Sequence, residues 1–199
     1  MSEVDVANQA LSLLGAKSIT AFDDATNEAT LVSLNYANVR DAVLEQAAWT
    51  FADASLVLEN PVPGDWGAGE MLYALPEGVI RVYRAYRRVS GPSPVPLEGW
   101  RREGDAIRVR YSGPVYATAT MRIEDVDQWT AGFRQTTVAR LAAELAMPIT
   151  RSRSLHQSLW EQYHLKLRDA AASDAGQARS ERTDSTELVR TRFADGLLP

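Results

Sequence analysis

The sequence predicts an α+β fold: an antiparallel helical bundle of about four helices, with an inserted small antiparallel β module and an extended C-terminal arm. Three observations predict it. Apolar residues recur at helical spacing near both ends of the folded region, they alternate with period two in the middle, and the last two dozen residues form a polar stretch that ends in apolar anchors. These changes divide the chain into helical residues 1–60, β residues 61–125, helical residues 126–175 and the arm, residues 176–199.

The N-terminal part predicts two helices. Ser2 and Asp5 have the spacing of a capping box, and Gly15 supplies a C-terminal stop for a short first helix. After a turn-rich connector, a longer helix is expected over about residues 27–48. The apolar positions that define these helices are Val4, Ala7, Leu11 and Leu14 in the first and Val32, Tyr36, Val39 and Val43 in the second.

The middle part predicts four to five antiparallel strands. In the segment that begins at Val79, alternation places Val79, Arg81 and Tyr83 on one face. A hairpin is expected about Gly104-Asp105. The clearest strand runs over residues 115–123, with valine, alanine, methionine and isoleucine at every second position.

The C-terminal part predicts two more helices. The first carries Phe133 on its apolar face and is expected to end at Pro148. Ser154 is the expected cap of the second, which the alanines at 170–172 are expected to end.

Composition excludes several classes of function. The 199 residues are 45% hydrophobic and contain no cysteine, so thiolate metal sites and cysteine nucleophiles are excluded. No apolar run reaches the ~20 residues of a membrane span, and the N-terminus has no signal-peptide pattern, so we expect a soluble protein that is not exported by that route. His156 and His164 are two helical turns, about 12 Å, apart and cannot share a metal ion.

No catalytic motif is found, so we expect no enzymatic activity and no cofactor. Neighbouring carboxylates such as Asp23-Asp24, Glu124-Asp125 and Asp125-Asp127 lie in loops. Glycosidase chemistry needs two carboxyl groups at a fixed separation in a cleft, whereas adjacent loop acids commonly form turns or cap helices. We favour the turn and capping roles.

Charge is distributed unevenly. Residues 1–60 hold nine acidic and two basic side chains, a net charge of −7, whereas the whole chain carries −5. Such an acidic region suits a surface along which DNA slides without adhering. A surplus of acidic residues is, however, more often simply the solvent-exposed face of a helix. The candidate acids are Asp23, Asp24, Glu28, Asp41 and Glu45.

Arginines and tryptophans of the β module are the candidates for subunit or tail contacts. Arg87-Arg88 and Arg101-Arg102 flank a proline-rich loop, where they can meet phosphate or, as we favour, acids of a neighbouring subunit. Trp66 and Trp100 lie in expected loops and are candidates for contacts outside the protomer. The other tryptophans, Trp49, Trp129 and Trp160, are expected to fill the seam between the helical and β parts.

The C-terminal residues combine a polar tether with anchoring side chains. GQARSERTDSTE buries too little apolar area to fold alone. Apolar residues and arginines follow it, which favours an arm that becomes ordered on another subunit; the alternative is a frayed terminus. The candidate anchors are Leu188, Val189, Arg190, Arg192, Phe193, Leu197 and Leu198.

Over residues 4–172 the chain resembles the head-to-tail adaptor proteins of tailed bacteriophages, the tail tubular protein A family. The resemblance rests on RDAVLEQAAWTFA at 40–52, ALPEG at 74–78 and FRQTTVARLAAELAMPIT at 133–150. These are structural motifs and not catalytic ones.

The resemblance implies a ring, commonly of twelve copies, at the neck of the virion, made from protein synthesised in the host cytoplasm. Such a ring docks beneath the portal protein, extends the DNA channel and presents a platform for a tail nozzle or tail-completion protein. It implies that the arm reaches the portal and that DNA passes without sequence-specific binding, with no contact to a membrane. Adaptors of long-tailed phages, whose partner is a stopper or a tail terminator, fit the sequence equally. The alternative from another class is a DNA-binding accessory protein that uses the arginine-rich β module.

Overall fold

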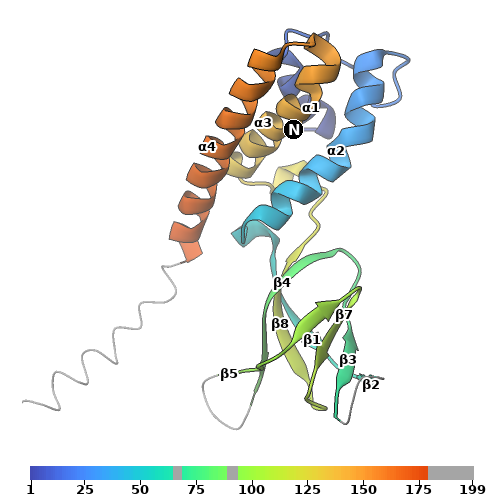
Figure 1. Ribbon diagram of the computed structural model, residues 1–199, viewed down its shortest axis with the longest axis vertical. Coiled ribbons are helices and arrows are strands. Elements are labelled where there is room, and N and C mark those ends of the chain that lie inside the picture. Colours follow the sequence, from blue (N-terminus) through green and yellow to red (C-terminus); the bar gives the residue numbers. More distant parts are fainter. Residues whose placement is uncertain (65–68, 89–93, 179–199) are drawn as a thin grey trace, which may run out of the picture.

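The computed structural model describes residues 1–64, 69–88 and 94–178. This part of the chain contains four α-helices and two antiparallel sheets, so the predicted α+β class is confirmed. Helices lie at one end of the molecule and strands at the other (Figure 1). The helices are α1 (Glu3–Leu13), α2 (Asn27–Gln46), α3 (Ala131–Thr150) and α4 (Arg153–Ala178), with the 3-10 turns η1 (Thr50–Ala52) and η2 (Val126–Gln128). The strands are β1 (Asp53–Leu58), β2 (Val62–Pro63), β3 (Met71–Ala74), β4 (Val79–Arg87), β5 (Val95–Pro96), β6 (Arg101–Glu103), β7 (Ala106–Val109) and β8 (Val115–Met121).

Both ends of α1 agree with the sequence. The Ser2 hydroxyl accepts the Asp5 amide, and the Asp5 carboxylate accepts the Ser2 amide at 2.7 Å, which completes the capping box. Gly15 adopts φ +65°, a left-handed conformation that glycine takes without strain. The amides of Gly15 and Ala16 then donate to carbonyls of the last turn, which ends the helix in a Schellman motif.

Helices α3 and α4 differ from the prediction at their junction. Pro148 does not end α3, because it lies in the last turn, and the helix continues to Thr150. The left-handed Arg151, with φ 56°, breaks the helix instead. Ser152 and not Ser154 caps α4, because its hydroxyl accepts the Leu155 amide at 3.3 Å. Helix α4 also continues past the alanines to Ala178, three residues into the segment assigned to the arm.

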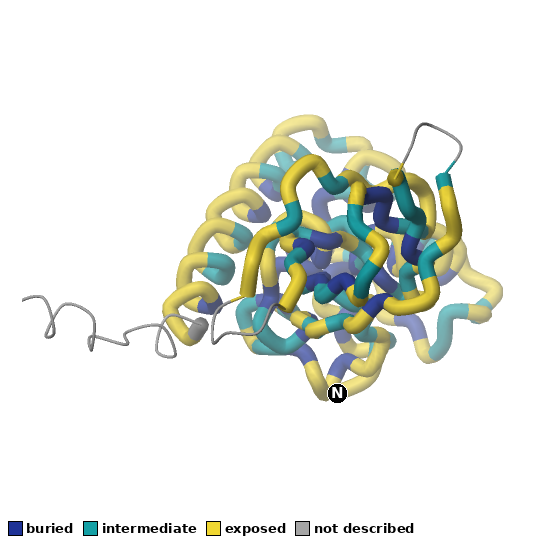
Figure 2. The backbone as a smooth tube through the Cα atoms, turned by 90° about the horizontal axis from the view of Figure 1, so that it is seen from below, coloured by how far each residue is buried: buried dark blue, intermediate teal, exposed yellow. Residues whose placement is uncertain are grey.

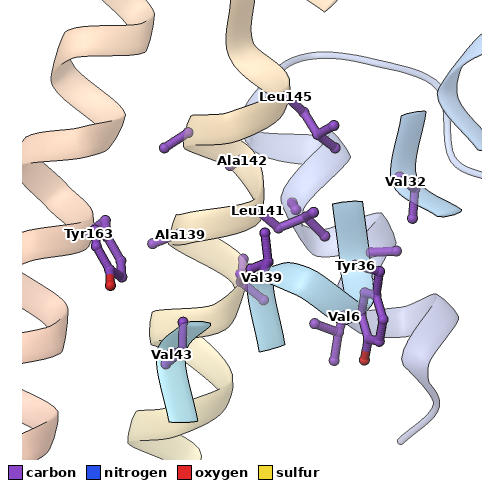
Figure 3. Close-up of a cluster of buried hydrophobic side chains, with 14 of the residues drawn as sticks. Val6, Val32, Tyr36, Val39, Val43, Ala139, Leu141, Ala142, Leu145 and Tyr163 are labelled. Carbon is purple, nitrogen blue, oxygen red and sulfur yellow. The ribbon is translucent and has the colours of Figure 1, made fainter. Parts of the chain in front are cut away.

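The helices pack around α3. Leu141 and Leu145 point from α3 toward α1 and α2, whereas Ala139 points toward Tyr163 of α4 (Figure 3). Each of these residues is buried in one common core. The backbones of α3 and α4 approach closely, since a Cβ atom on Gly132 would lie 3.0 Å from that of Ala170.

An aromatic cluster closes the seam where the chain leaves and re-enters the helical part. The Phe133 ring of α3 lies 5.1 Å from the Trp49 ring, 5.0 Å from Phe51 and 4.9 Å from Trp129. Both tryptophans also donate their indole N–H to backbone carbonyls. Trp49 and Trp129 therefore fill the seam as predicted. Trp160 does not, because it packs on α4 against Arg140 and Tyr163.

The β part forms two four-stranded sheets and not one of four to five strands. Their orders are β1-β8-β4-β5 and β2-β3-β7-β6, and every pairing is antiparallel. Side chains from both sheets share a second core, which includes Tyr73, Ile107 and Val115. Viewed from this end, buried residues run through the middle of the molecule, with exposed turns around them (Figure 2).

Strand β4 departs from simple alternation. Its pairing with β8 shifts register between Val79 and Arg81 and again between Val82 and Arg84. Each shift has the form of a β-bulge, which adds one residue to one strand of a pair. The core side chains therefore recur every third residue, at Val79, Val82 and Ala85, and the predicted common face of Val79, Arg81 and Tyr83 is wrong. Strand β8, in contrast, buries Val115, Ala117 and Ala119 as its alternation predicts.

Candidate interaction surfaces

The five candidate channel acids lie in two separate groups. Asp23 and Asp24 lie in the connector before α2, and Glu28 is in the first turn of that helix. Asp41 and Glu45 lie near its other end, about 20 Å and about 25 Å from Glu28 along the axis at ~1.5 Å per residue. The structure therefore does not join the five carboxylates into one acidic surface.

Asp24 has a local structural role. Its carboxylate accepts the Thr20 amide at 2.6 Å, the Thr20 hydroxyl at 2.9 Å and the Ala21 amide at 3.2 Å. Hydrogen bonds from Thr20, and then from Ala21, hold the pKa of Asp24 below its usual value. The turn-forming role expected for loop acids thus applies here, as it does to Asp125, whose carboxylate accepts the Asp127 amide at the start of η2.

Asp41 connects α2 to the β module. Its carboxylate pairs with Arg40 at 2.8 Å and with Arg122 at 2.9 Å. Arg40 also lies 3.4 Å from Glu124. A nearby bond from Arg81 to the Glu45 carbonyl, at 3.1 Å, makes a second link between the two parts. The Asp41 charge is thus used within the protomer, whereas the Glu45 side chain is exposed.

Arg87 and Arg88 lie at the end of β4, exposed and beside tyrosines. The Arg88 guanidinium lies 4.8 Å from the ring centre of Tyr116, and that of Arg87 lies 5.7 Å from Tyr111. Tyr86 stacks on Tyr116 with 5.7 Å between ring centres and 19° between planes. An arginine held over an aromatic face keeps its N–H donors free for an anionic partner.

The second arginine pair divides between two roles. Arg102 donates to the carbonyls of Ile80 at 2.5 Å, Val79 at 3.1 Å and Gly104 at 2.9 Å. It thereby connects β6 to β4, and its assignment as a subunit or tail contact stays a prediction. Arg101 is exposed, as that assignment requires.

Trp100 lines a groove on the β module. The groove has a volume of about 630 Å³ and is walled by aromatic, proline and leucine side chains. Trp100 is half-buried there, so only part of its ring remains for an external contact. The side chains that line the groove include those of Tyr83, Arg84, Tyr86, Pro96, Leu97 and Trp100.

The remaining candidates lie outside the described residues. These are Trp66 and all the proposed anchors of the arm: Leu188, Val189, Arg190, Arg192, Phe193, Leu197 and Leu198.

Sequence reasoning missed a buried charge cluster in the second sheet. Arg108 on β7 forms an ion pair with Glu70 and lies 3.5 Å from Glu103, while the exposed Arg110 reaches Glu70 at 3.4 Å. The Arg108 hydrogen bond is the main cause that holds the pKa of Glu70 below its usual value. A signal was present, since Arg108 stands between Ile107 and Val109 in a strand that is buried on both sides.

A second missed cluster joins the end of α4 to the start of β1. The Asp174 carboxylate is only 4% exposed and accepts the Thr50 amide at 2.7 Å and the Thr50 hydroxyl at 3.0 Å. Next to it, the Tyr83 hydroxyl donates to Asp53 at 2.6 Å. Burial is the main cause that raises the pKa values of both Asp53 and Tyr83. Because Asp174 is far from Thr50 in sequence, no local pattern indicates this contact.

The described residues contain no group of three or more histidine, cysteine or carboxylate side chains placed to hold a metal ion. His156 accepts the indole N–H of Trp160 at 3.0 Å, and the His164 ring centre lies 5.8 Å from that of Trp160. Among the described helices, none has both the length and the apolar character that a membrane span requires. Comparison of the chain with models of protein families and with curated proteins gives no match.

Proposed function

We propose that this protein is a structural, non-enzymatic head-to-tail adaptor of a tailed bacteriophage, located at the virion neck. In this proposal a homo-oligomeric ring, commonly of twelve copies, docks beneath the portal protein, extends the DNA channel and receives a tail nozzle or tail-completion protein. The four helices act as a bundle that carries the β module, and residues 179–199 act as the arm. The family resemblance of residues 4–172 motivates the proposal.

The single observation that carries it is how the described chain ends. Helix α4 packs along α3, and Asp174 fixes its last turns to Thr50 at the junction of the helical and β parts. The described chain therefore ends at a point that is fixed relative to both parts, at the end of α4 nearest the β module (Figure 1). Residues 179–199, which follow, carry apolar and arginine anchors that suit a protein interface.

The decisive experiment mixes the chain with portal rings of the same phage and measures co-sedimentation. Removal of residues 186–199 should abolish stable docking and leave the melting temperature within a few degrees, because the described residues already form both apolar cores. Phe193→Ala should weaken docking and Thr183→Ala, in the tether, should not. Docking of the truncated chain at full strength would contradict the arm hypothesis.

Ring formation is expected to need the portal. The free protein should scatter light as a monomer or a weak associate at micromolar concentration, because the arm, a principal anchor, links the chain to a partner only when the portal is present. A stable ring formed by the purified chain alone would contradict template-dependent assembly while leaving docking itself testable.

A DNA-binding accessory role is the second candidate, and one observation favours it. Arg87 and Arg88 lie over tyrosine rings beside Tyr86 and Tyr116, and arginines together with aromatic side chains are common in surfaces that bind single-stranded nucleic acids. A salt-dependent shift of single-stranded or duplex DNA by the purified chain, lost in Arg87→Ala/Arg88→Ala, would favour this role over the adaptor.

A further inference from the structure

Three of the four outer edges of the two sheets carry features that discourage pairing with another strand. Strands β2 and β5 are two residues long and each contains a proline, Pro63 and Pro96. Strand β6 is Arg101–Glu103, in which every residue is charged and exposed. Short strands, proline and charge are the usual means by which proteins protect a sheet edge.

The fourth edge, that of β1, lacks this protection. The strand is six residues long and contains no proline, lysine or arginine. It pairs with β8 on one side, from Asp53 opposite Thr120 to Leu58 opposite Val115, and no described residue pairs with its other side. Its one charged side chain, Asp53, is at the end of the strand and accepts the Tyr83 hydroxyl.

Side chains along β1 are incompletely covered on both faces. Ala54 and Leu56, which face the core, are only half-buried, and Val57 on the other face is 55% exposed. An added strand would supply neighbours on both faces, since cross-strand pairs are the unit of sheet stabilisation.

We propose that the outer edge of β1 binds residues 188–193 of the same chain as an additional strand. The segment LVRTRF alternates, with Val189, Thr191 and Phe193 on one side and Leu188, Arg190 and Arg192 on the other. Valine, threonine and phenylalanine favour strands, and they would lie on the side of Leu56. The two arginines would lie on the solvent side, next to Ser55 and Val57.

The geometry of α4 brings this segment within reach. Asp174 holds the end of the helix to Thr50, three residues before β1 begins. Residues 179–187 can span about 30 Å at 3.3–3.6 Å per residue, whereas β1 is about 20 Å long. A short tether of this kind gives an effective concentration in the millimolar range, which favours the chain's own segment over that of a second copy.

Such a strand would have two consequences that do not depend on the identity of the arm's final partner. It would cover an edge that otherwise invites aggregation. It would also occupy several anchors of the arm, so that a partner binds only by displacing them from β1.

Hydrogen exchange at single residues, without any partner present, tests the proposal. The exchange rates of the full chain are to be compared with those of a chain that ends at residue 186. The truncation should raise the exchange rate of the β1 amides that point away from β8 by about tenfold or more, and leave the amides of α3 unchanged. Protection of the full chain should not vary with protein concentration.

Two proline variants keep the test valid if the truncated chain folds poorly. The amides of Arg190 and Thr191 would point in opposite directions in a strand, so one of Arg190→Pro and Thr191→Pro must remove a ladder hydrogen bond. At least one of them should reproduce the faster exchange, and Thr183→Pro in the tether should not. Unchanged exchange at β1 in both variants, or protection that appears only as concentration rises, would overturn the proposal.

Discussion

The helical part and the β module are held together in different ways. Around α3, three aromatic rings enclose Phe133, and aliphatic side chains of all four helices complete the core. The β module has a smaller apolar core and adds polar contacts, among them Arg108 with Glu70 and the Tyr73 hydroxyl with the carbonyls of Tyr111 and Gly113. Buried polar groups with fixed partners occur in both parts, since Arg40 and Asp174 belong to the helical part, so the two parts differ chiefly in the size and aromatic content of their apolar cores.

The largest effect is expected at the centre of the helical core. Phe133→Ala should lower the free energy of unfolding by about 3–5 kcal/mol, because it removes a fully buried ring and leaves a cavity among three others. Denaturant unfolding measures this change. Leu34→Ala on α2 is the control, since Leu34 is 66% exposed and should cost less than about 0.5 kcal/mol. A similar small cost for Phe133→Ala would mean that the seam is not the main support of the fold.

Among the charged residues of the β module, Arg108 is expected to show the largest loss of unfolding free energy on substitution. Arg108→Ala leaves the mostly buried Glu70 carboxylate without its main partner and should cost about 2–3 kcal/mol, the scale of a hydrogen bond to a charged group. Arg110→Ala is a matched control, because Arg110 contacts the same carboxylate but its side chain is 73% exposed, and it should cost below about 1 kcal/mol. For Arg108→Ala, amides of β3 and β7 should exchange hydrogen faster, and amides of α3 should exchange at an unchanged rate. Equal losses of unfolding free energy for Arg108→Ala and Arg110→Ala would show that the burial of Arg108 does not increase its contribution.

The junction between the two parts depends on Asp174. Asp174→Ala removes the acceptor of the Thr50 amide and should cost about 1–2 kcal/mol, with faster exchange at Thr50 and in the last turn of α4. Asp169→Ala, on the same helix, removes only an exposed pair with Arg168 and should have no measurable effect. If Asp174→Ala left the Thr50 amide protected, the end of α4 would not be fixed by this contact.

Local patterns in the sequence predicted much of the helical part and less of the β module. Capping and apolar spacing located α1 and α2 because a helix makes its contacts within a few residues. The double shift of β4 could not be predicted, since its register depends on β8, more than thirty residues away. Arg102, which the sequence placed at an interface, binds carbonyls of β4 for the same non-local reason.

For the candidate interfaces too, the sequence predicted exposure better than it predicted contacts between distant residues. Exposure of Arg87, Arg88 and Arg101 agrees with their assignment, because charged residues in strand ends and loops normally lie at the surface. The five acids do not join into one surface, since the length of α2 separates Asp23, Asp24 and Glu28 from Asp41 and Glu45, and Asp41 pairs with Arg122, which only the folded chain brings near it. Where the acids and the arm lie in an assembly remains a prediction for the complex with a portal.

The smallest effect is a difference in pH dependence between two carboxylates of the β module, Glu70 beside β3 and Asp53 at the start of β1. The folded pKa of Glu70 is below its ordinary value of 4.5, because Arg108 donates to it, so the unfolded chain binds the proton more readily. The contribution of Glu70 to stability is therefore complete above that ordinary value and is lost as the pH falls through the lower folded pKa. Asp53 has the opposite sign: burial raises its folded pKa above 3.8, so its contribution is present at low pH and is lost as the pH rises through the raised value. Denaturant unfolding from pH 3 to pH 7 should therefore show a shallower acid loss for Glu70→Gln than for the unchanged chain, and a steeper one for Asp53→Asn. Parallel curves for all three proteins would show that neither carboxylate couples folding of the chain to proton binding.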